Sequence, residues 1–173
     1  DFSESNQIEI LVKYARENLN CGVVFSCSNL VDQYGDVLAT DFDGREHKFK
    51  SHVSYSPVIK GSCMSEFLTY SCVLPNLSAA LVNRNLYEAA DRLSESFIVV
   101  SDWELWLKLS QRTDFYYVNI PLNNFRQHQT TIRSSVKMKV QILEIFRMFQ
   151  NHLQLYSFTE KQIFKFRLGF GAI

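Results

Sequence analysis

The chain has 173 residues, which fits one domain or the larger part of one, and 46% of them are hydrophobic against 21% charged. Eighteen basic and eighteen acidic residues give a formal net charge of zero, which argues against the basic surface of a duplex-binding domain. No stretch reaches the ~20 apolar residues of a membrane-spanning helix, and the first residues lack a signal-peptide pattern. We therefore expect a soluble, cytoplasmic protein with no nucleic-acid partner.

The N-terminal part has the alternation of helix and strand that is typical of an α/β domain. Apolar residues at helical spacing predict a helix over 8–19. The run GVVFSCS at 22–28 is β-branched and apolar, so it predicts a strand buried on both faces, with a turn around Gly35 after it. Residues 39–75 have no clear period, and we expect them to form a long functional loop with short elements.

The second half is more strongly patterned. A tryptophan-rich helix is expected from Ser101 or Asp102, either of which can cap it. The other predicted elements are a strand over 77–82 with a short helix after it, a strand over 114–122 closed by Pro121, a helix over 135–154 and a second helix from Thr159.

The four cysteines, at positions 21, 27, 63 and 72, are too few for a disulfide framework and contain no C-x-x-C pair. We expect them to be reduced and mostly buried, although Cys63 and Cys72 are the two that an oxidising compartment would bridge. Asp32, Asp36, Asp41 and Asp43 lack the ligand pattern of a calcium loop and predict a solvated, turn-rich surface.

Few residues are candidates for chemistry. Asp102 lies at the predicted start of an aromatic helix, where a carboxylate either caps the helix or acts as a general base at the mouth of a cleft. By spacing alone, the cap is the more common role. Arg126 and His128 are two residues apart, so in an extended segment both point the same way and can hold a phosphate or complete a metal site. A solvated loop is the other interpretation of that pair.

No Gly-rich dinucleotide motif, Walker loop, HExxH or GxSxG is present. Their absence argues against a complete Rossmann oxidoreductase, a P-loop enzyme, a zincin and an α/β-hydrolase.

Several segments, in order, resemble the second half of a family 2 glycosyltransferase of the GT-A fold. The resemblance is strongest over LSAALVNRNLYEAADRL, SDWELWLKLSQRTDFYYVNIPL and NNFRQHQTTIRSS. In that family an aspartate motif continues into a tryptophan-rich helix, and a strand and an R-x-H loop follow. Asp102 falls on that aspartate, and Arg126 with His128 falls on the loop. Ser101 stands where many relatives carry an acidic residue.

The resemblance implies an α/β structure that is a portion of a GT-A mixed-sheet fold with C-terminal helices. Asp102 would deprotonate an acceptor hydroxyl, whose oxygen then attacks the anomeric carbon of a nucleotide-diphosphate sugar with inversion. Arg126 and His128 would bind the donor diphosphate, with His128 near or on a divalent metal, Mn²⁺ or Mg²⁺. Trp103 would form a wall of the acceptor pocket.

The N-terminus is similar to the segment just after the family's metal-binding DxD motif, so Asp1 is at most the end of that motif. This implies that the nucleotide-binding first half precedes Asp1 and that this chain alone is inactive. We accordingly divide the chain into 1–134, the second half of a GT-A domain, and 135–173, C-terminal helices that pack on it.

The leading interpretation is a hexosyl or related transferase of surface or cell-wall polysaccharide synthesis, acting on a saccharide or lipid-linked acceptor. The alternative is a non-catalytic binding or oligomerisation module of the same fold. The phenylalanines of the C-terminal helices predict a contact between copies or with the inner face of a membrane, unless they pack on the first half. A third interpretation, an unrelated α/β domain, predicts that Asp102 and His128 lie far apart.

Overall fold

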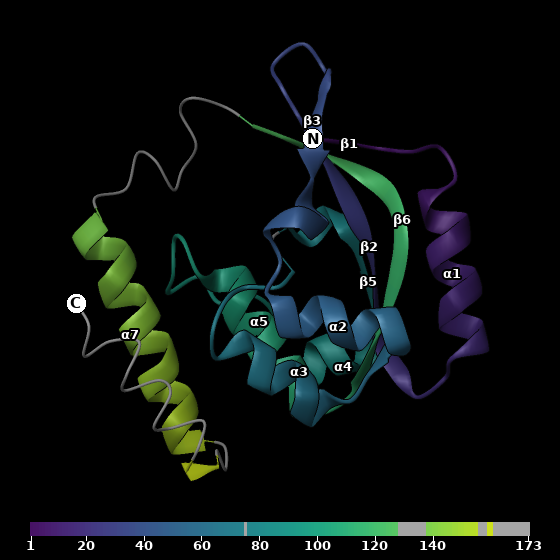
Figure 1. Ribbon diagram of the computed structural model, residues 1–173. Coiled ribbons are helices and arrows are strands. Elements are labelled where there is room, and N and C mark those ends of the chain that lie inside the picture. The colour runs from purple at the N-terminus through teal and green to yellow at the C-terminus, as the bar shows by residue number, and fades with distance from the viewer. Residues whose placement is uncertain (75, 128–137, 156–158, 161–173) are drawn as a thin grey trace.

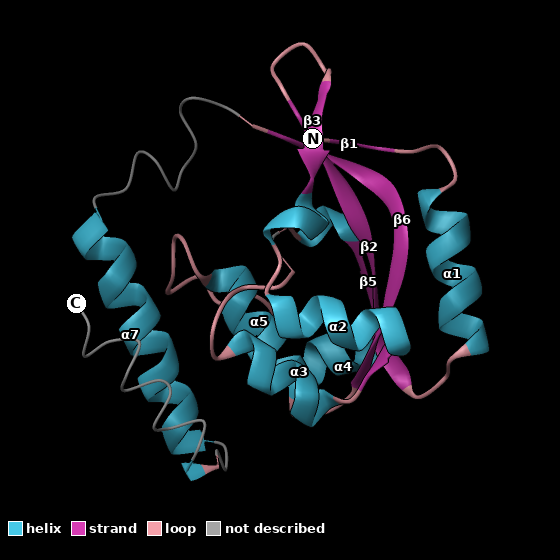
Figure 2. Ribbon diagram, viewed as in Figure 1, coloured by secondary structure: helices cyan, strands magenta, loops and turns pink. Residues whose placement is uncertain are grey.

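The computed structural model describes residues 1–74, 76–127, 138–155 and 159–160, and these form a mixed α/β structure with helices on both faces of a sheet (Figure 1, Figure 2). The predicted α/β class is therefore confirmed. The strands are β1 (Phe2–Ser3), β2 (Cys21–Val31), β3 (Val37–Thr40), β4 (Val58–Ile59), β5 (Ala80–Val82) and β6 (Asp114–Arg126). The helices are α1 (Gln7–Glu17), α2 (His47–Tyr55), α3 (Gly61–Leu68), α4 (Arg84–Ala89), α5 (Ser101–Ser110) and α7 (Met138–Leu155), with 3-10 turns η1 (Asp41–Gly44) and η2 (Leu77–Ala79).

The centre of the sheet is the parallel pair of β2 and β6. β1 and β4 pair with β6, and β3 and β5 pair with β2, all four antiparallel. Residues 21–28 of β2 are buried without a break, as expected of a strand covered on both faces. The strand predicted over 22–28 is thus confirmed, and the turn at Gly35 follows it with φ +101°.

β6 does not end at Pro121, which corrects the prediction that this residue closes the strand. The pairing continues to Arg126, opposite Val31, but its register shifts on both sides of Cys27, the partner of Pro121. A proline has no N–H to give to the ladder, so an irregularity at this point lets the strand pass through it. The longer strand carries Arg126 to the carboxyl end of the parallel pair.

Helix α1 covers one face of the sheet. Leu11 is 1% exposed and packs with Val24, Val118 and Leu122. The helix predicted over 8–19 is confirmed, although its buried face is narrower than its apolar pattern suggests, because Leu19 lies beyond the helix and is 87% exposed.

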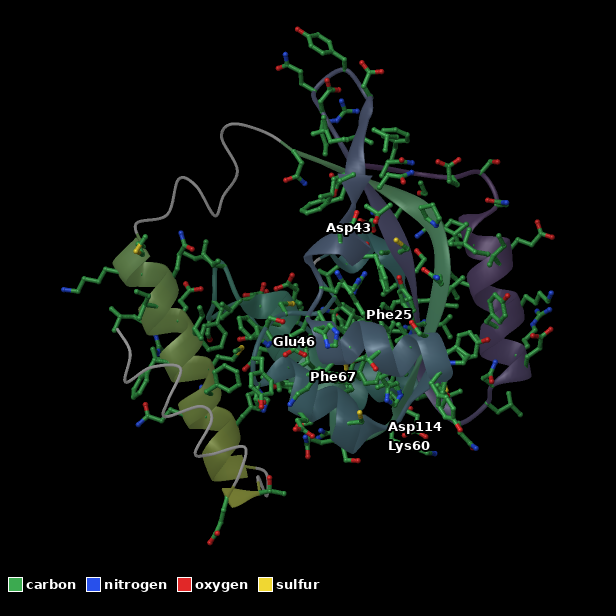
Figure 3. All side chains as sticks on the ribbon, in the orientation of Figure 1. Phe25, Asp43, Glu46, Lys60, Phe67 and Asp114 are labelled. Atoms are coloured by element: carbon green, nitrogen blue, oxygen red, sulfur yellow. The ribbon has the colours of Figure 1, made fainter. Side chains whose placement is uncertain are left out.

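The opposite face is covered by α2, α3 and α5, which share the larger core (Figure 1). The short elements expected within 39–75 are present as the end of β3, η1, α2, β4 and α3, but α2 and α3 pack in the core, so the segment is not the long loop that was predicted to carry them. Phe49 of α2 is fully buried, and its ring meets Phe25 of β2 and Phe67 of α3. Figure 3 shows Phe25 and Phe67 within this layer. α2 buries only Phe49, which leaves too little apolar periodicity for the sequence to reveal it.

The C-terminal helix α7 lies on the far side of the helical layer from α1 (Figure 1). It falls within the helix predicted over 135–154 apart from one residue, and Met148 and Phe149 join the larger core. The predicted boundary at 134/135 and nearly all of the helix predicted from Thr159 lie outside the described residues. Among the helices that the structure describes, none has the length and apolar character to cross a membrane.

Candidate functional site

Helix α5 holds the first two candidate residues, Asp102 and Trp103, and it is anchored deep in the core. The Trp106 ring is fully buried, and its Nε1 donates a hydrogen bond to the Leu74 carbonyl at 3.1 Å. Trp103 Nε1 donates to the Leu68 carbonyl at 2.8 Å. Two indole anchors one turn apart fix α5 against the end of α3 and the segment after it, so the position of Asp102 is rigidly set.

Asp102 is half-buried in the first turn of α5. The helix begins at Ser101, and its N-cap is Val100, which has no side-chain cap. The prediction that Ser101 or Asp102 caps the helix is therefore wrong. Instead Asp102 Oδ1 accepts a hydrogen bond from the Trp103 N–H at 2.7 Å, at the helix end where the macrodipole favours negative charge.

Trp103 is mostly committed to packing. Its side chain is buried, with 9% of the residue exposed, and its ring meets the Phe149 ring of α7 edge to face at 5.6 Å between centroids. The part that stays accessible lines a pocket beside α5. Trp103 thus packs in the core and also faces a hollow. Its proposed role as a wall of the acceptor pocket remains a prediction.

That hollow, which we call the α5–α7 pocket, has a volume of about 360 Å³. Its three walls are the segment after α3, the residues on either side of Asp102, and α7. The lining residues are Tyr70, Ser71, Cys72, Val99, Val100, Trp103, Gln141 and Ile145. No carboxylate and no cation is among them. An uncharged lining of aromatic, aliphatic, hydroxyl and amide groups suits a neutral ligand with both apolar and hydrogen-bonding surface.

Glu144 of α7 secures the segment that leads into α5. Its buried carboxylate accepts hydrogen bonds from the N–H of Ile98, at 3.0 and 3.1 Å, and from that of Val99, at 2.8 Å. These are charge-assisted bonds to backbone groups that no helix or strand ladder satisfies. The sequence analysis missed this residue, because only the fold brings positions 46 residues apart together.

Arg126 lies at the end of β6, away from the pocket. Its Nη1 donates hydrogen bonds to the carbonyls of Asp32, at 3.3 Å, and Gln33, at 2.5 Å, in the β2–β3 turn. Its guanidinium stands 5.8 Å from the centroid of the Phe2 ring, and its backbone N–H donates to Asp1 Oδ1 at 3.0 Å. The structure therefore brings Arg126 to Asp1 and the turn rather than into contact with Asp102.

The predicted metal ligand cannot be placed, because His128 lies outside the described residues. Within the ranges that the structure describes, no three His, Cys, Asp or Glu side chains converge as a metal site. Asp1, the proposed end of a metal motif, accepts the Arg126 N–H instead. The cation therefore remains a prediction.

A polar cluster that sequence reasoning missed lies between the carboxyl-terminal parts of β2 and β6. Asn76 Nδ2 and Asn123 Nδ2 donate to Ser28 Oγ at 3.3 and 3.4 Å. All three residues are buried. The Lys60–Asp114 ion pair lies at the opposite end of the sheet, at the bottom of Figure 3. Ligands of open α/β sheets commonly bind outside the carboxyl ends of the strands, which is where this cluster and Arg126 lie.

Asp41 is buried in the core, so the prediction that it belongs to a solvated, turn-rich surface is wrong for this residue. Its carboxylate pairs with Arg45 at 2.7 Å, both side chains are 3% exposed, and it also accepts the Ser28 N–H at 2.9 Å. Burial, together with the Asp41 charge, raises the pKa of the Cys27 thiol to about 11. Cys27 is therefore an inert core thiol. All four cysteines are free, as expected, but only Cys21 and Cys27 are buried, whereas Cys63 and Cys72 are half-buried.

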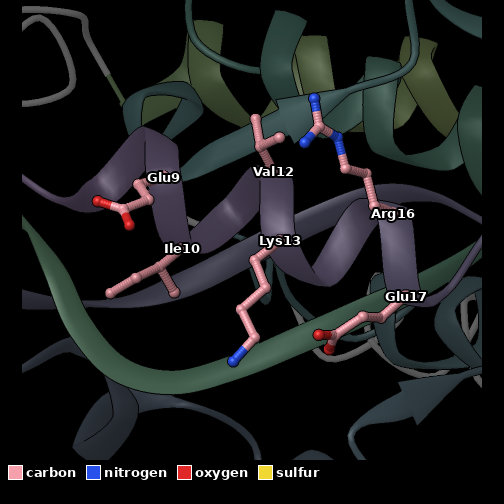
Figure 4. Close-up of a pocket in the computed structure, with 6 residues that line it drawn as sticks. All are labelled: Glu9, Ile10, Val12, Lys13, Arg16 and Glu17. Atoms are coloured by element: carbon pink, nitrogen blue, oxygen red, sulfur yellow. The ribbon is translucent and has the colours of Figure 1, made fainter.

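Two further hollows differ from the α5–α7 pocket. One, of about 590 Å³, runs along α1 (Figure 4), and its lining residues are Glu9, Ile10, Val12, Lys13, Arg16 and Glu17. The other, of about 390 Å³, lies between α5 and α7 on the side of Lys108 and Arg147, and its lining also includes Asp91 and Glu104. Both are rich in charges of either sign, so neither offers a neutral ligand the uncharged surroundings that the α5–α7 pocket offers.

Searches of the chain against protein-family models and against curated proteins find no match. The described residues form an α/β structure with a mixed sheet, and Val100 and Trp103, which precede and follow Asp102 in the sequence, line an uncharged pocket.

Proposed function

We propose that the protein is an inverting family 2 glycosyltransferase and that this chain is the acceptor-side portion of its GT-A domain. The observation that carries the proposal is the position of Asp102. This half-buried carboxylate lies in the first turn of α5, between Val100 and Trp103, both of which line the uncharged α5–α7 pocket. Asp102 itself is not among the lining residues, so the proposal is that its carboxylate takes a proton from a hydroxyl of a neutral ligand that extends from the pocket past the start of α5.

In the proposed reaction, an acceptor hydroxyl loses its proton to Asp102 while its oxygen forms a bond to the anomeric carbon of the donor. The bond from that carbon to the nucleoside diphosphate breaks on the opposite face, so the configuration inverts. The Trp103 N–H donates a hydrogen bond to Asp102 Oδ1 at 2.7 Å, which helps to orient the carboxylate. The anchored α5 helix supplies the fixed geometry that such a transfer needs.

The donor diphosphate is proposed to bind at the carboxyl end of the β2–β6 pair, near Arg126, and because Arg126 lies away from the α5–α7 pocket, the proposal requires the donor sugar to extend from there toward α5. The carbonyls of Asp32 and Gln33 occupy Nη1, and a guanidinium has five N–H donors in all. Arg126 can therefore hold the turn and meet a leaving-group oxygen at the same time. His128 is proposed as its partner on the diphosphate.

The test is the stereochemistry of transfer by the full-length protein. UDP-, GDP- and dTDP-activated hexoses are incubated with Mn²⁺ and a neutral methyl glycoside, and the anomeric proton of the new linkage is followed by NMR. We expect one donor to give a glycoside with the configuration opposite to that of the donor. A product of retained configuration contradicts a single displacement with Asp102 as base, and no transfer from any donor contradicts the proposed activity.

One observation favours the second candidate, a non-catalytic binding module. Val140, Leu143 and Phe146 are 38%, 50% and 43% exposed and follow one another at intervals of three residues on the outer side of α7. Such a row suits contact with a second copy or with the inner face of a membrane. This candidate predicts concentration-dependent self-association or vesicle binding that Leu143→Glu abolishes, together with no transfer in the stereochemical assay.

A further inference from the structure

The α5–α7 pocket differs in charge from the hollow next to it. Acidic and basic side chains from α5 and α7, including Glu104, Lys108 and Arg147, line the neighbouring hollow. The α5–α7 pocket is bounded by the same two helices, yet its lining has no charged group. A diphosphate needs cations or aligned N–H groups around it, so the uncharged pocket is unsuited to the donor's leaving group. A neutral ligand loses little hydration free energy when it enters this pocket.

The lining also has the two kinds of surface that a sugar ring needs. The rings of Tyr70 and Trp103 and the side chain of Ile145 provide apolar surface for the C–H face of a ring. The Ser71 hydroxyl and the Gln141 amide provide donors and acceptors for its hydroxyl groups. The volume of about 360 Å³ is near the lower end for small-molecule pockets, which suits one or two sugar units.

Helix α7 is a fixed wall of this pocket. Glu144 bonds to the backbone of Ile98 and Val99, and Phe149 packs on Trp103, so contacts with the segment around Asp102 hold Gln141 and Ile145 in place. A pocket built from two rigidly joined elements is preorganised, and preorganisation lowers the entropic cost of binding.

We propose that the α5–α7 pocket binds an uncharged sugar unit of the acceptor, and that Gln141 of α7 is a specificity-determining residue that hydrogen-bonds to it. This inference rests on the proposed function and deepens it, because it names the acceptor class and makes the C-terminal helix part of the acceptor site.

The test is ¹⁹F NMR of the protein labelled with 5-fluorotryptophan, in which the Trp103 resonance is identified by its absence from Trp103→Phe. The probes are the methyl β-glycosides of glucose, galactose and N-acetylglucosamine, with methyl glucuronide as the charged counterpart. We expect at least one neutral glycoside to shift the Trp103 resonance saturably, with methyl glucuronide binding at least about fivefold more weakly.

Two variants and a matched control locate the binding. Gln141→Ala is expected to weaken binding of the neutral glycoside at least about fivefold. Ser71→Phe fills the pocket and is expected to abolish the shift of the Trp103 resonance. Gln150→Ala, an exposed glutamine of the same helix, is expected to leave affinity unchanged. Far-ultraviolet circular dichroism checks that each variant is folded.

The inference is overturned if no neutral glycoside shifts the Trp103 resonance, if folded Gln141→Ala and Ser71→Phe bind as the wild type does, or if methyl glucuronide binds more tightly. Its failure is distinguishable from that of the proposed function. Inverting transfer without a shift of the Trp103 resonance would refute only the proposed sugar-binding pocket. A saturable shift without transfer would refute only the proposed enzymatic activity.

Discussion

Replacing Glu144 with alanine tests how firmly α7 is joined to the segment before Asp102. The substitution removes the acceptor of the Ile98 and Val99 N–H groups, whose bonds to the carboxylate are 2.8–3.1 Å long. Hydrogen bonds to a charged group each contribute about 1.5–3 kcal/mol, but these N–H groups are only partly buried and water can reach them in part. We expect the free energy of unfolding to fall by about 2–4 kcal/mol.

For a chain of this size each kcal/mol shifts the melting temperature by roughly 2–4 °C, so Glu144→Ala should lower it by about 4–16 °C. Urea unfolding followed by tryptophan fluorescence measures the free energy directly, because Trp103 is in contact with Phe149 of the same helix. Glu144→Gln keeps one neutral acceptor oxygen, so its free energy of unfolding should fall by about half as much as that of Glu144→Ala. Glu17→Ala, at an exposed position of α1, is the matched control and should change stability by less than about 0.5 kcal/mol. An equal stability of Glu144→Ala and wild type would refute the reasoning.

Two further predictions concern buried titratable groups. Burial, followed by the charge of Lys108, lowers the pKa of His152 from 6.5 to about 4, so the unfolded chain binds a proton between these pH values that the folded one does not. Stability should therefore fall by up to about 3 kcal/mol as the pH drops from about 6.5 to 4. His152→Gln should flatten that part of the denaturation profile while His47→Gln, at an exposed site, leaves it intact, and the same slope in both variants would contradict the assignment. Asp41→Ala should destabilise the protein by about 3–5 kcal/mol in urea unfolding, because it leaves Arg45 buried without its carboxylate. The exposed Asp43→Ala is its control, and similar losses in the two would show that the pair is not buried as described.

The apolar elements were predictable because their signals are local. β2 is a run of β-branched and aromatic residues and lies buried where that run predicts, and α5 buries Trp106 as its spacing suggests. Segment 39–75 was interpreted as a loop with short elements because α2 has one buried apolar residue, Phe49, in nine positions. Its helical structure depends on contacts with Phe25 and Phe67, which are distant in sequence.

The candidate site was predictable only in part. The aspartate at the start of an aromatic helix drew attention to Asp102, but the pocket beside it has a wall from α7 that no local pattern reveals. Glu144 and Asp41 look like ordinary surface carboxylates in the sequence, and only the fold shows that backbone N–H groups and Arg45 satisfy them. Long-range polar pairs leave no periodicity, which is why sequence reasoning did not find them.

The central claim, that Asp102 is the base for glycosyl transfer, is tested most directly by the single-turnover rate of Asp102→Asn in the full-length protein. Asparagine has nearly the same shape and retains an oxygen that can accept the Trp103 N–H, and donor binding measured beside the rate separates loss of the base from loss of the fold or of donor affinity. The account predicts a rate about 10²–10⁴-fold below wild type at equal donor binding, with the exposed Asp91→Asn as the unaffected control. A wild-type rate in folded Asp102→Asn contradicts it.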